Sequence, residues 1–458
     1  MRLIYLYSAI AFLAAGCSTQ QNQVATQETN QIAQPVAPSN RVLYRLANQG
    51  LPDSSRWKST PTLIDINQDG LLDLAAHPRL EHGARVWLGD KQGTWTDASQ
   101  GLDMPTSCGG GLELGDINKD GKLDMAVADH CGGVFVYLGR DNTTWQATTE
   151  GLNSALAQKK EKLSPEMNTL NGAEELALGD VNEDGFLDII ATGSDEGGFT
   201  VYLGDGSGKK WRESKADGLP SAEDPGDEEF HAGWSFDVQL HDMNNDKHLD
   251  VVANYYSGPH IWLGDGKGHW QSKAKGLTVT SMGGIYRRLS VADINGDGRQ
   301  DLAAANNLNG AEAYLQNADG SWQGPTDMLP QIKEGAMAIA LGDLDGDGHT
   351  DAVIGGRLSS TNFDNPAGIQ IVLGDGKGNW HYEQGTQLPV DGMEEIWGIT
   401  LADINGDKRL DIVVASGSTS TNTVTTSSTQ VRKGNRHKET KLPHLQVWLS
   451  ESLGSKPL

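Results

Sequence analysis

A nine-residue pattern, D-x-N/D-x-D-G/K-x-x-D, recurs seven times and constrains the fold of this 458-residue chain more than any other feature. Successive copies start 51, 64, 62, 51, 50 and 60 residues apart, which is the length of a four-stranded β-propeller blade with variable loops. Seven copies therefore predict seven blades. The copies begin at Asp65, Asp116, Asp180, Asp242, Asp293, Asp343 and Asp403.

Each motif is followed by short runs that alternate between β-prone segments and turns. An apolar run such as MAVADH comes first, then a run such as VWLGD, and a GDGxG turn leads into a strand opened by tryptophan. The 57 glycines fit such a turn-rich chain, and no helix is needed to explain any segment. The prediction is an all-β chain. The tryptophans at strand 4 are Trp95, Trp145, Trp211, Trp270, Trp322 and Trp380.

The two ends of the repeat region complement each other. The chain ends on HLQVWLSESLG, a third strand with no tryptophan strand after it. Near the other end, the segment from Tyr44 to Pro52 matches the tryptophan strands, with Tyr44 in the tryptophan position. We therefore expect an N-terminal strand to complete the last blade and close the ring, which leaves no unpaired edge.

These repeats resemble the FG-GAP or VCBS repeats of integrin α-subunit heads and of many bacterial surface proteins. The resemblance covers residues 41–458 and implies a seven-bladed β-propeller with a calcium ion in the loop between strands 1 and 2 of each blade. It says little about the ligand that such a propeller binds.

The chemistry of the motif supports the expected calcium sites. Calcium prefers six to eight oxygen ligands, and the loop offers side-chain oxygens at positions 1, 3, 5 and 9 and a carbonyl at position 7. A single copy could equally be a solvated turn, but seven copies at blade spacing make that reading untenable for the set. The predicted ligands are Asp65, Asn67, Asp69, Leu71, Asp73, Asp116, Asn118, Asp120, Lys122, Asp124, Asp180, Asn182, Asp184, Phe186, Asp188, Asp242, Asn244, Asp246, His248, Asp250, Asp293, Asn295, Asp297, Arg299, Asp301, Asp343, Asp345, Asp347, His349, Asp351, Asp403, Asn405, Asp407, Arg409 and Asp411.

We expect up to seven Ca²⁺ ions with a structural role. The motifs contain 22 aspartates, against a formal net charge of −25, so a metal-free ring would repel itself at seven points. The sixth loop has an additional carboxylate, Asp345, and should bind most tightly. The fourth and seventh loops carry Lys247 and Lys408 in place of glycine, which predicts backbone strain and repulsion of the ion.

The N-terminus predicts export. Arg2 precedes an apolar run from Leu3 to Ala15, too short to span a bilayer, which ends in LAAGC. This end resembles a bacterial lipobox, so residues 1–16 are interpreted as a lipoprotein signal peptide and Cys17 as the lipidated residue. A polar tether would follow over 17–40, and Ser18 implies outer-membrane sorting. Ordinary cleavage to a soluble product is the alternative.

The two other cysteines, Cys108 and Cys131, are predicted to form a disulfide. An exported chain permits the bond. Cys108 lies eight residues before Asp116 and Cys131 lies seven residues after Asp124, which puts both cysteines at the same end of adjacent strands.

All conspicuous insertions fall on the face opposite the calcium loops, at 153–171, 221–232, 358–367 and 416–443. Such loops are where a repeated scaffold usually places recognition, although purposeless drift is the alternative. Side chains at the start of strand 1 would line the centre of the ring at this face. They could contact a sugar or peptide, or they could simply plug the ring. The predicted ligand-binding residues are Trp57, Trp234, Tyr286, Arg287 and Trp397.

The leading functional hypothesis is a cell-surface scaffold, most simply monomeric, that binds an unknown protein or glycan. No motif assigns a catalytic residue, although His77 and His130 near this face keep open an enzyme that acts on polysaccharide. A structural partner in an envelope complex is the third hypothesis. The only membrane contact expected is the lipid anchor, and no nucleic-acid partner is expected.

Overall fold

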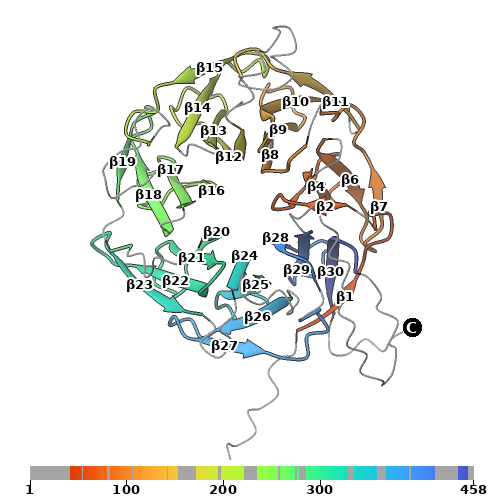
Figure 1. The fold of residues 1–458 in the computed structure, drawn as a ribbon, viewed down its shortest axis with the longest axis vertical. Helices are drawn as coiled ribbons and strands as arrows, with labels where there is room; N and C mark the ends of the chain where they lie inside the picture. Colours follow the sequence, from red (N-terminus) through yellow and green to blue (C-terminus); the bar gives the residue numbers. More distant parts are fainter. Residues whose placement is uncertain are drawn as a thin grey trace, which may run out of the picture. The chain divides into compact units, whose positions relative to one another are not determined.

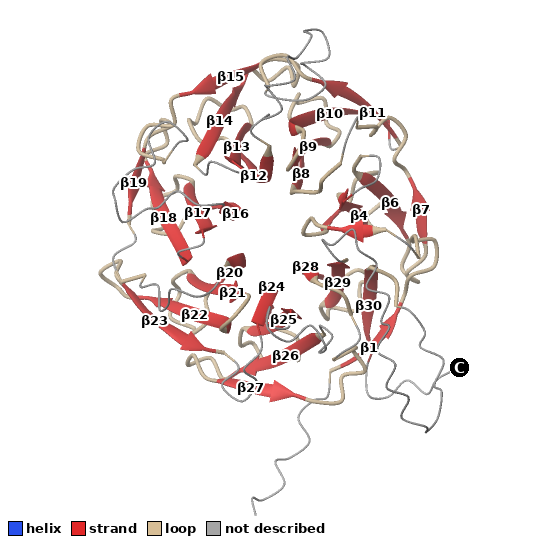
Figure 2. Cartoon of the chain, viewed as in Figure 1, coloured by secondary structure: helices blue, strands red, loops and turns tan. Residues whose placement is uncertain are grey.

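The computed structural model shows an all-β fold (Figure 2). No helix in the described part of the chain has the length and apolar character needed to cross a membrane. The chain divides into Met1–Ser39 and Asn40–Leu458, and the second unit contains every described strand. The structure describes residues 42–451, except 54, 80–82, 105–106, 142, 153–171, 194–197, 221–234, 256–257, 274–275, 278–284, 329–334, 358–367, 391–392 and 418–441.

Seven four-stranded antiparallel sheets form a ring, which confirms the predicted seven-bladed propeller (Figure 1). Blades 1 to 4 consist of β3 (Thr62–Ile64), β4 (Asp73–Ala76), β6 (Arg85–Gly89), β7 (Trp95–Asp97); β8 (Leu112–Gly115), β9 (Asp124–Asp129), β10 (Gly133–Asp141), β11 (Thr144–Thr148); β12 (Ala173–Gly179), β13 (Asp188–Gly193), β14 (Phe199–Gly204), β15 (Trp211–Ser214); and β16 (Ser235–His241), β17 (Asp250–Tyr255), β18 (Gly258–Gly264), β19 (Trp270–Ser272). Blades 5 to 7 consist of β20 (Tyr286–Ala292), β21 (Asp301–Asn306), β22 (Gly310–Gln316), β23 (Trp322–Asp327); β24 (Gly335–Gly342), β25 (Asp351–Arg357), β26 (Ile369–Gly374), β27 (Trp380–Glu383); and β28 (Ile396–Ala402), β29 (Asp411–Ser416), β30 (Leu445–Glu451), β1 (Leu43–Leu46).

The last blade closes the ring as predicted. Strand β1 pairs with β30 in antiparallel register, and Tyr44 lies opposite Ser450. Tyr44 is fully buried in the tryptophan position of this blade. The first and last strands of the described chain therefore lie in one sheet, and no blade of the ring lacks its outer strand.

The core lies between the blades. The second strand of each sheet is buried on both faces, because a neighbouring blade covers each side. This explains the continuous apolar runs after each motif, where an exposed sheet would show alternation. Strand β17, for example, packs Val251 and Ala253 toward blade 3 and Val252 toward blade 5.

An outer seam joins successive blades through the tryptophan strands. The backbone N–H of Trp95 donates to the Gln49 carbonyl at 2.8 Å. The backbone N–H groups of Trp145, Trp211 and Trp270 form the same bond at three further seams. Gly50, after Gln49, has a φ of 97°, and a Cβ there would lie 1.9 Å from the Trp95 carbonyl oxygen. The Gly-Leu pair that follows Tyr44 and most of the tryptophan strands therefore marks a close approach between the backbones of neighbouring blades.

Candidate functional site

The seven motif loops share one backbone conformation. Position 4 has a φ between 55° and 78° in every copy, and position 6 has a φ between 67° and 89°. This path turns the N–H groups of positions 5 and 6 toward the carboxylate at position 1. In the first loop, Asp69 and Gly70 donate to Asp65 at 3.0 and 2.9 Å. The position-1 side chain therefore organises the loop.

The two lysines at position 6 do not disturb this geometry. Lys247 and Lys408 have φ values of 75° and 67°, within the left-handed region that the glycines occupy. Their N–H groups donate at 2.8 Å to Asp242 and Asp403, as the glycines do in the other loops. The loops of blades 4 and 7 thus keep the common shape, and the effect of their lysines on ion binding stays a prediction.

The ninth-position aspartate has a role that the motif alone did not reveal. In blade 1, one oxygen of Asp73 accepts the Ile66 N–H at 2.9 Å, and the other accepts the Gly89 N–H of strand 3 at 2.9 Å. The bond to strand 3 recurs in every blade. These buried carboxylates connect each loop to the third strand, so their presence in all seven motifs has a structural reason beyond metal binding. The only available signal was the glycine that usually ends strand 3.

Burial raises the pKa of these ninth-position carboxyls above the usual range. It reaches about 7 at Asp188 and about 6 at Asp124 and Asp250, where backbone donors oppose the shift and nearby motif aspartates add to it. A nearby cation would favour the ionised form of the same groups.

The residues of the sixth loop fit a calcium ion. Carboxylate oxygens of Asp343, Asp345 and Asp351 lie within 4.8 Å of one another, so three hard anionic ligands converge on one point. Burial, followed by repulsion from Asp347 and Asp343, raises the pKa of Asp345. The other loops place an asparagine oxygen at this position. Calcium in all seven loops stays a prediction.

Arg288 occupies the centre of the ring at the opposite face, where strand 1 begins. Its guanidinium donates to Glu175 of blade 3, to the Phe236 carbonyl of blade 4 at 3.0 Å and to the Lys58 carbonyl before blade 1 at 3.1 Å. Its Nε donates to the Trp397 carbonyl of blade 7 at 3.0 Å. One buried side chain therefore connects five blades.

Acidic side chains outnumber this arginine. Asp237 lies 3.9 Å from the Arg288 guanidinium. The Glu175 carboxylate occupies the space beside Gly111, where a Cβ would lie 1.2 Å from it, so a larger residue at this position would displace that carboxylate. Burial, then repulsion from Glu175 and Asp237, raises the pKa of Glu113 to about 8. Glu113 is therefore mostly protonated at neutral pH.

Two further cations, Arg287 and Lys58, lie near Arg288 at the ring centre. The Arg287 guanidinium lies 3.9 Å from the Phe236 ring and 5.4 Å from the Trp397 ring, and Lys58 Nζ lies 5.9 Å from Trp397. Lys58 forms a buried ion pair with Glu174 at 2.6 Å. Burial alone would raise the pKa of Glu174, but Lys58 and a hydrogen bond from His130 hold it below its usual range.

The three described aromatic residues of the predicted ligand-binding set, Trp57, Tyr286 and Trp397, are buried. Trp57 is 1% exposed and packs edge-on against Trp87 at 5.4 Å. Tyr286 is 1% exposed and donates to Glu312 at 2.6 Å. Trp397 donates to the Gly417 carbonyl at 2.8 Å. This burial favours the plug interpretation, although the recognition role stays a prediction.

Several other predicted features lie outside the described residues. They are Trp234, Cys17, the insertions at 153–171, 221–232 and 358–367, and nearly all of the insertion at 416–443.

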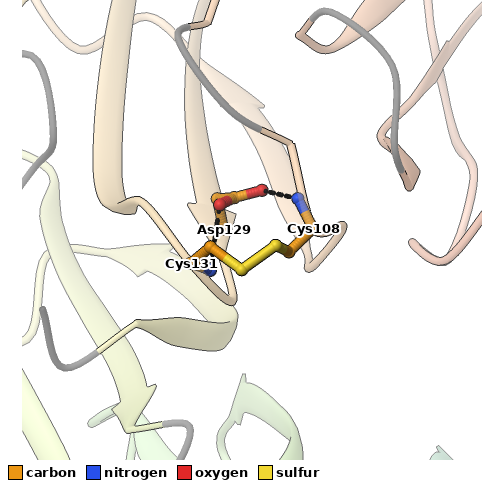
Figure 3. A group of neighbouring side chains, drawn as sticks. All are labelled: Cys108, Asp129 and Cys131. Carbon is orange, nitrogen blue, oxygen red and sulfur yellow. Dashed lines mark hydrogen bonds between the residues drawn. A yellow bond between two sulfur atoms is a disulfide. The ribbon is translucent and has the colours of Figure 1, made fainter. Parts of the chain in front are cut away.

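The predicted disulfide is formed. Cys108 and Cys131 are bonded with their Cα atoms 5.6 Å apart (Figure 3). Buried Asp129 lies between them and accepts the Cys108 N–H at 2.7 Å and the Cys131 N–H at 3.0 Å. The bond crosses the start of blade 2 at the face opposite the motif loops, since Cys131 follows the end of strand β9.

His77, Ser107 and Asp129 meet next to this disulfide but do not form a catalytic relay. Both Ser107 Oγ at 3.2 Å and Asp129 Oδ2 at 3.5 Å approach His77 Nε2, whereas Nδ1 faces the Ala128 carbonyl. A relay needs the serine and the carboxylate on different nitrogens. His77 is also fully buried, and burial lowers its pKa.

A cavity of about 420 Å³ lies between blades 4 and 5 on the motif-loop face. Met243, Ile261 and Trp322 form its apolar wall, and Lys273 and Asp319 are among its polar lining. A Cβ at Gly320, in the adjoining turn, would meet nothing within 4 Å, whereas one at Gly208 in blade 3 would lie 2.6 Å from Leu138 of blade 2. This seam is thus more open than its counterpart between blades 2 and 3, a difference that the repeat spacing did not predict.

Fold and loops together define a seven-bladed propeller built on aspartate-rich loops. The model of the FG-GAP-like repeat matches residues 65–127, 242–304, 293–354 and 358–414, which together are half of the chain. The chain therefore belongs to the FG-GAP-like repeat family, and the resemblance inferred from the motifs is confirmed.

Several solved structures are similar to this chain at low sequence identity. BBS1N in complex with ARL6DN is 10% identical, with 89% of this chain and 97% of that chain covered and a TM-score of 0.51. A lectin from Burkholderia pseudomallei is 13% identical over 79% and 93%, with a TM-score of 0.47. An Agrocybe aegerita lectin, solved for its recognition of non-reducing terminal N-acetylglucosamine, is 18% identical over 71% and 79%, with a TM-score of 0.43. Likeness at this level concerns the fold alone.

Proposed function

We propose that this protein is a calcium-stabilised binding scaffold whose recognition surface is the face opposite the motif loops. Its partner would be a protein or a carbohydrate, and Cys17 would anchor the chain to the outer membrane through a lipid. The loops of the recognition face differ between blades, whereas the motif loops repeat. The proposal therefore assigns stability to one face and specificity to the other.

One observation carries the proposal more than any other. Every motif loop is connected to strand 3 of its blade by a buried ninth-position aspartate, so the loops belong to the rigid frame. The proposed ligands of positions 1, 3 and 5 complete a hard oxygen set on this frame. Calcium held there would stabilise the folded ring, because the unfolded chain lacks the site.

Binding assays with product analysis test this function against the enzyme alternative. The mature chain, loaded with calcium, would be applied to a glycan array and used to capture proteins from an envelope extract. Reproducible binding without release of a cleaved or eliminated product supports the scaffold. Turnover of a bound polysaccharide would contradict it, and co-purification of one stoichiometric envelope protein would favour a structural partner.

Labelling tests the anchor separately. Growth with a radiolabelled or clickable fatty acid should label the full-length chain and not its Cys17→Ser variant. Equal labelling of both, or of neither, would refute lipidation at Cys17, and the scaffold proposal would then apply to a chain without this anchor.

A further inference from the structure

A two-stranded sheet at the start of blade 1 places two arginines side by side. Strands β2 (Arg56–Trp57) and β5 (Pro78–Arg79) pair in antiparallel register, with Arg56 opposite Arg79 and Trp57 opposite Pro78. Cross-strand partners share a face of the sheet, with their Cβ atoms about 5 Å apart. The two guanidinium groups therefore extend from neighbouring points on one face.

The direction of this face follows from its neighbours. Side chains alternate along a strand, and Trp57 is buried in the core beside Trp87. The side chains of Arg56 and Arg79 therefore extend to the other side, where each is half-buried. Arg79 in turn pairs with Cys108, whose disulfide partner Cys131 is exposed. The arginine pair thus lies at the face opposite the motif loops.

Within the described part of the chain, neither arginine side chain has a hydrogen-bond or ion-pair partner. Arg56 Nη1 and Arg79 Nε are buried from water and donate to nothing. The neighbouring cations differ, because Lys58 pairs with Glu174 and Arg288 pairs with Glu175. The acidic side chain Glu394 of blade 7 lies 3.6 Å from His444. No described carboxylate forms a hydrogen bond or ion pair with either arginine side chain.

This arrangement costs stability in the free protein. Like charges on directly opposite strand residues repel each other. A buried N–H without an acceptor also loses its hydrogen bonds to water without gaining a bond in the protein, which lowers the free energy of unfolding. Burial lowers the pKa of Lys58, its partner Glu174 opposes this shift, and Arg79 and Arg287 add smaller contributions to the lowering. In a chain with a net charge of −25, this is an unusual place to leave two cations unpaired.

We propose that Arg56 and Arg79 form a binding site for an oxyanion group, namely a sulfate, phosphate or carboxylate carried by the partner. Planar guanidinium groups match such groups with two parallel hydrogen bonds each, and the anion removes their mutual repulsion. The Cys108–Cys131 disulfide braces the edge that Arg79 pairs with, so it positions the site. This inference rests on the proposal that the same face recognises a partner.

Titration of small anions tests the site without any partner. Sodium sulfate, sodium phosphate and sodium glucuronate would each be titrated into the calcium-loaded protein by calorimetry, at constant ionic strength set with chloride. The compared proteins are the wild type, Arg56→Gln/Arg79→Gln and the control Arg212→Gln, which alters an exposed arginine on the outer strand of blade 3. Sulfate or phosphate preference indicates an ester group, and glucuronate preference indicates an acidic sugar.

We expect wild type and control to bind at least one anion with equal affinity, and the double variant to bind it on the order of a hundredfold more weakly, or about tenfold per guanidinium. The anion-free double variant should melt no lower than wild type, because the repulsion is gone. Anion binding by the double variant as tight as that of wild type, or no binding by wild type, would overturn the site. If the double variant does not fold, the anion affinity of Arg79→Lys is measured instead, because lysine keeps the charge and lacks the planar guanidinium. Weaker binding than wild type supports the site, and equal binding contradicts it.

Failure of this titration is distinguishable from failure of the scaffold proposal. A wild type that ignores the anions and still binds on the glycan array or captures a protein would lose only the arginine site. A wild type that binds the anions but no partner would retain the site and lose the proposed function.

Discussion

The two ends of each blade follow different rules. At the motif-loop end, positions 4 and 6 have positive φ in all seven copies, and each ninth-position aspartate accepts an N–H from strand 3. At the other end, the position five residues before each motif is different in nearly every blade. In chain order it is Thr60, Gly111, Glu175, Asp237, Arg288, Ala338 and Gly398. The repeated residues therefore form the loop structure that every blade requires. The differing residues form contacts at the ring centre that occur once in the molecule.

The consequence is that the two ends should respond to different perturbations. The motif-loop end should depend on calcium and be indifferent to changes at the centre of the ring. The ring centre should depend on the balance between Arg288 and its acidic neighbours, whether or not calcium is bound.

Removal of calcium should have the largest effect. Each occupied loop adds about 2.7 kcal/mol when free calcium exceeds its dissociation constant a hundredfold. Several loops together should lower the melting temperature by about 10 °C or more when EDTA is added. Calorimetric melts with and without EDTA, together with elemental analysis, measure this. An unchanged melt of a protein that contains no metal would refute the calcium sites.

Loss of Arg288 should rank second and be independent of calcium. Arg288→Met leaves the buried Glu175 and Asp237 without their counter-charge, which typically costs about 3–5 kcal/mol. Urea unfolding would measure the loss. Adding Glu175→Gln and Asp237→Asn should recover part of the stability. A triple variant no more stable than the single one would show that Arg288 acts through packing or its carbonyl contacts alone.

Two aspartates of the sixth loop should separate the two roles of the motif. Asp351→Asn should weaken the loop with or without calcium, since its carboxylate accepts the Leu344 and Gly374 N–H groups at 2.8 Å each, worth about 1.5–3 kcal/mol apiece. Asp345→Asn restores the residue of the other loops and should reduce stability only when calcium is present. The same loss for both variants in EDTA would contradict this division.

The smallest predicted effect is a pH dependence at the ring centre. Burial and its acidic neighbours raise the pKa of Glu113 to about 8 from the usual 4.5. The folded state therefore holds a proton that the unfolded state releases between these two values, so stability from this group falls as pH rises from about 4.5 to 8. Glu113→Gln should flatten the decline of the melting temperature across this window. If the variant and the wild type show the same dependence of melting temperature on pH, the Glu113 carboxyl is hydrated and its pKa is not raised.

Periodicity in the sequence predicted much of the fold and little of the ring centre. The motif spacing, the tryptophan strands and Tyr44 sufficed for seven blades and a closed ring, because each feature is local and repeated. The disulfide followed from two cysteines at matching strand ends. The calcium ligands were predicted from the chemistry of the motif and from its resemblance to FG-GAP repeats, and calcium binding stays a prediction.

The features that sequence reasoning missed are long-range and occur once. Arg288 contacts Glu175 and the Lys58 carbonyl, which are 113 and 230 residues away. No periodic signal links such positions, so Trp397 could be placed near the ring centre but not between Arg287 and Lys58. The pairing of Arg56 with Arg79 depends on a two-stranded sheet that, among the described residues, is found at blade 1 alone.

Amide hydrogen exchange with and without calcium tests most directly the claim that the two ends have separate roles. We predict that EDTA raises amide exchange mainly in the seven motif loops and the strand ends they join, while the first halves of β16 and β20 around Arg288 stay protected. Uniform loss of protection along every strand, or loss confined to the ring centre, would contradict it.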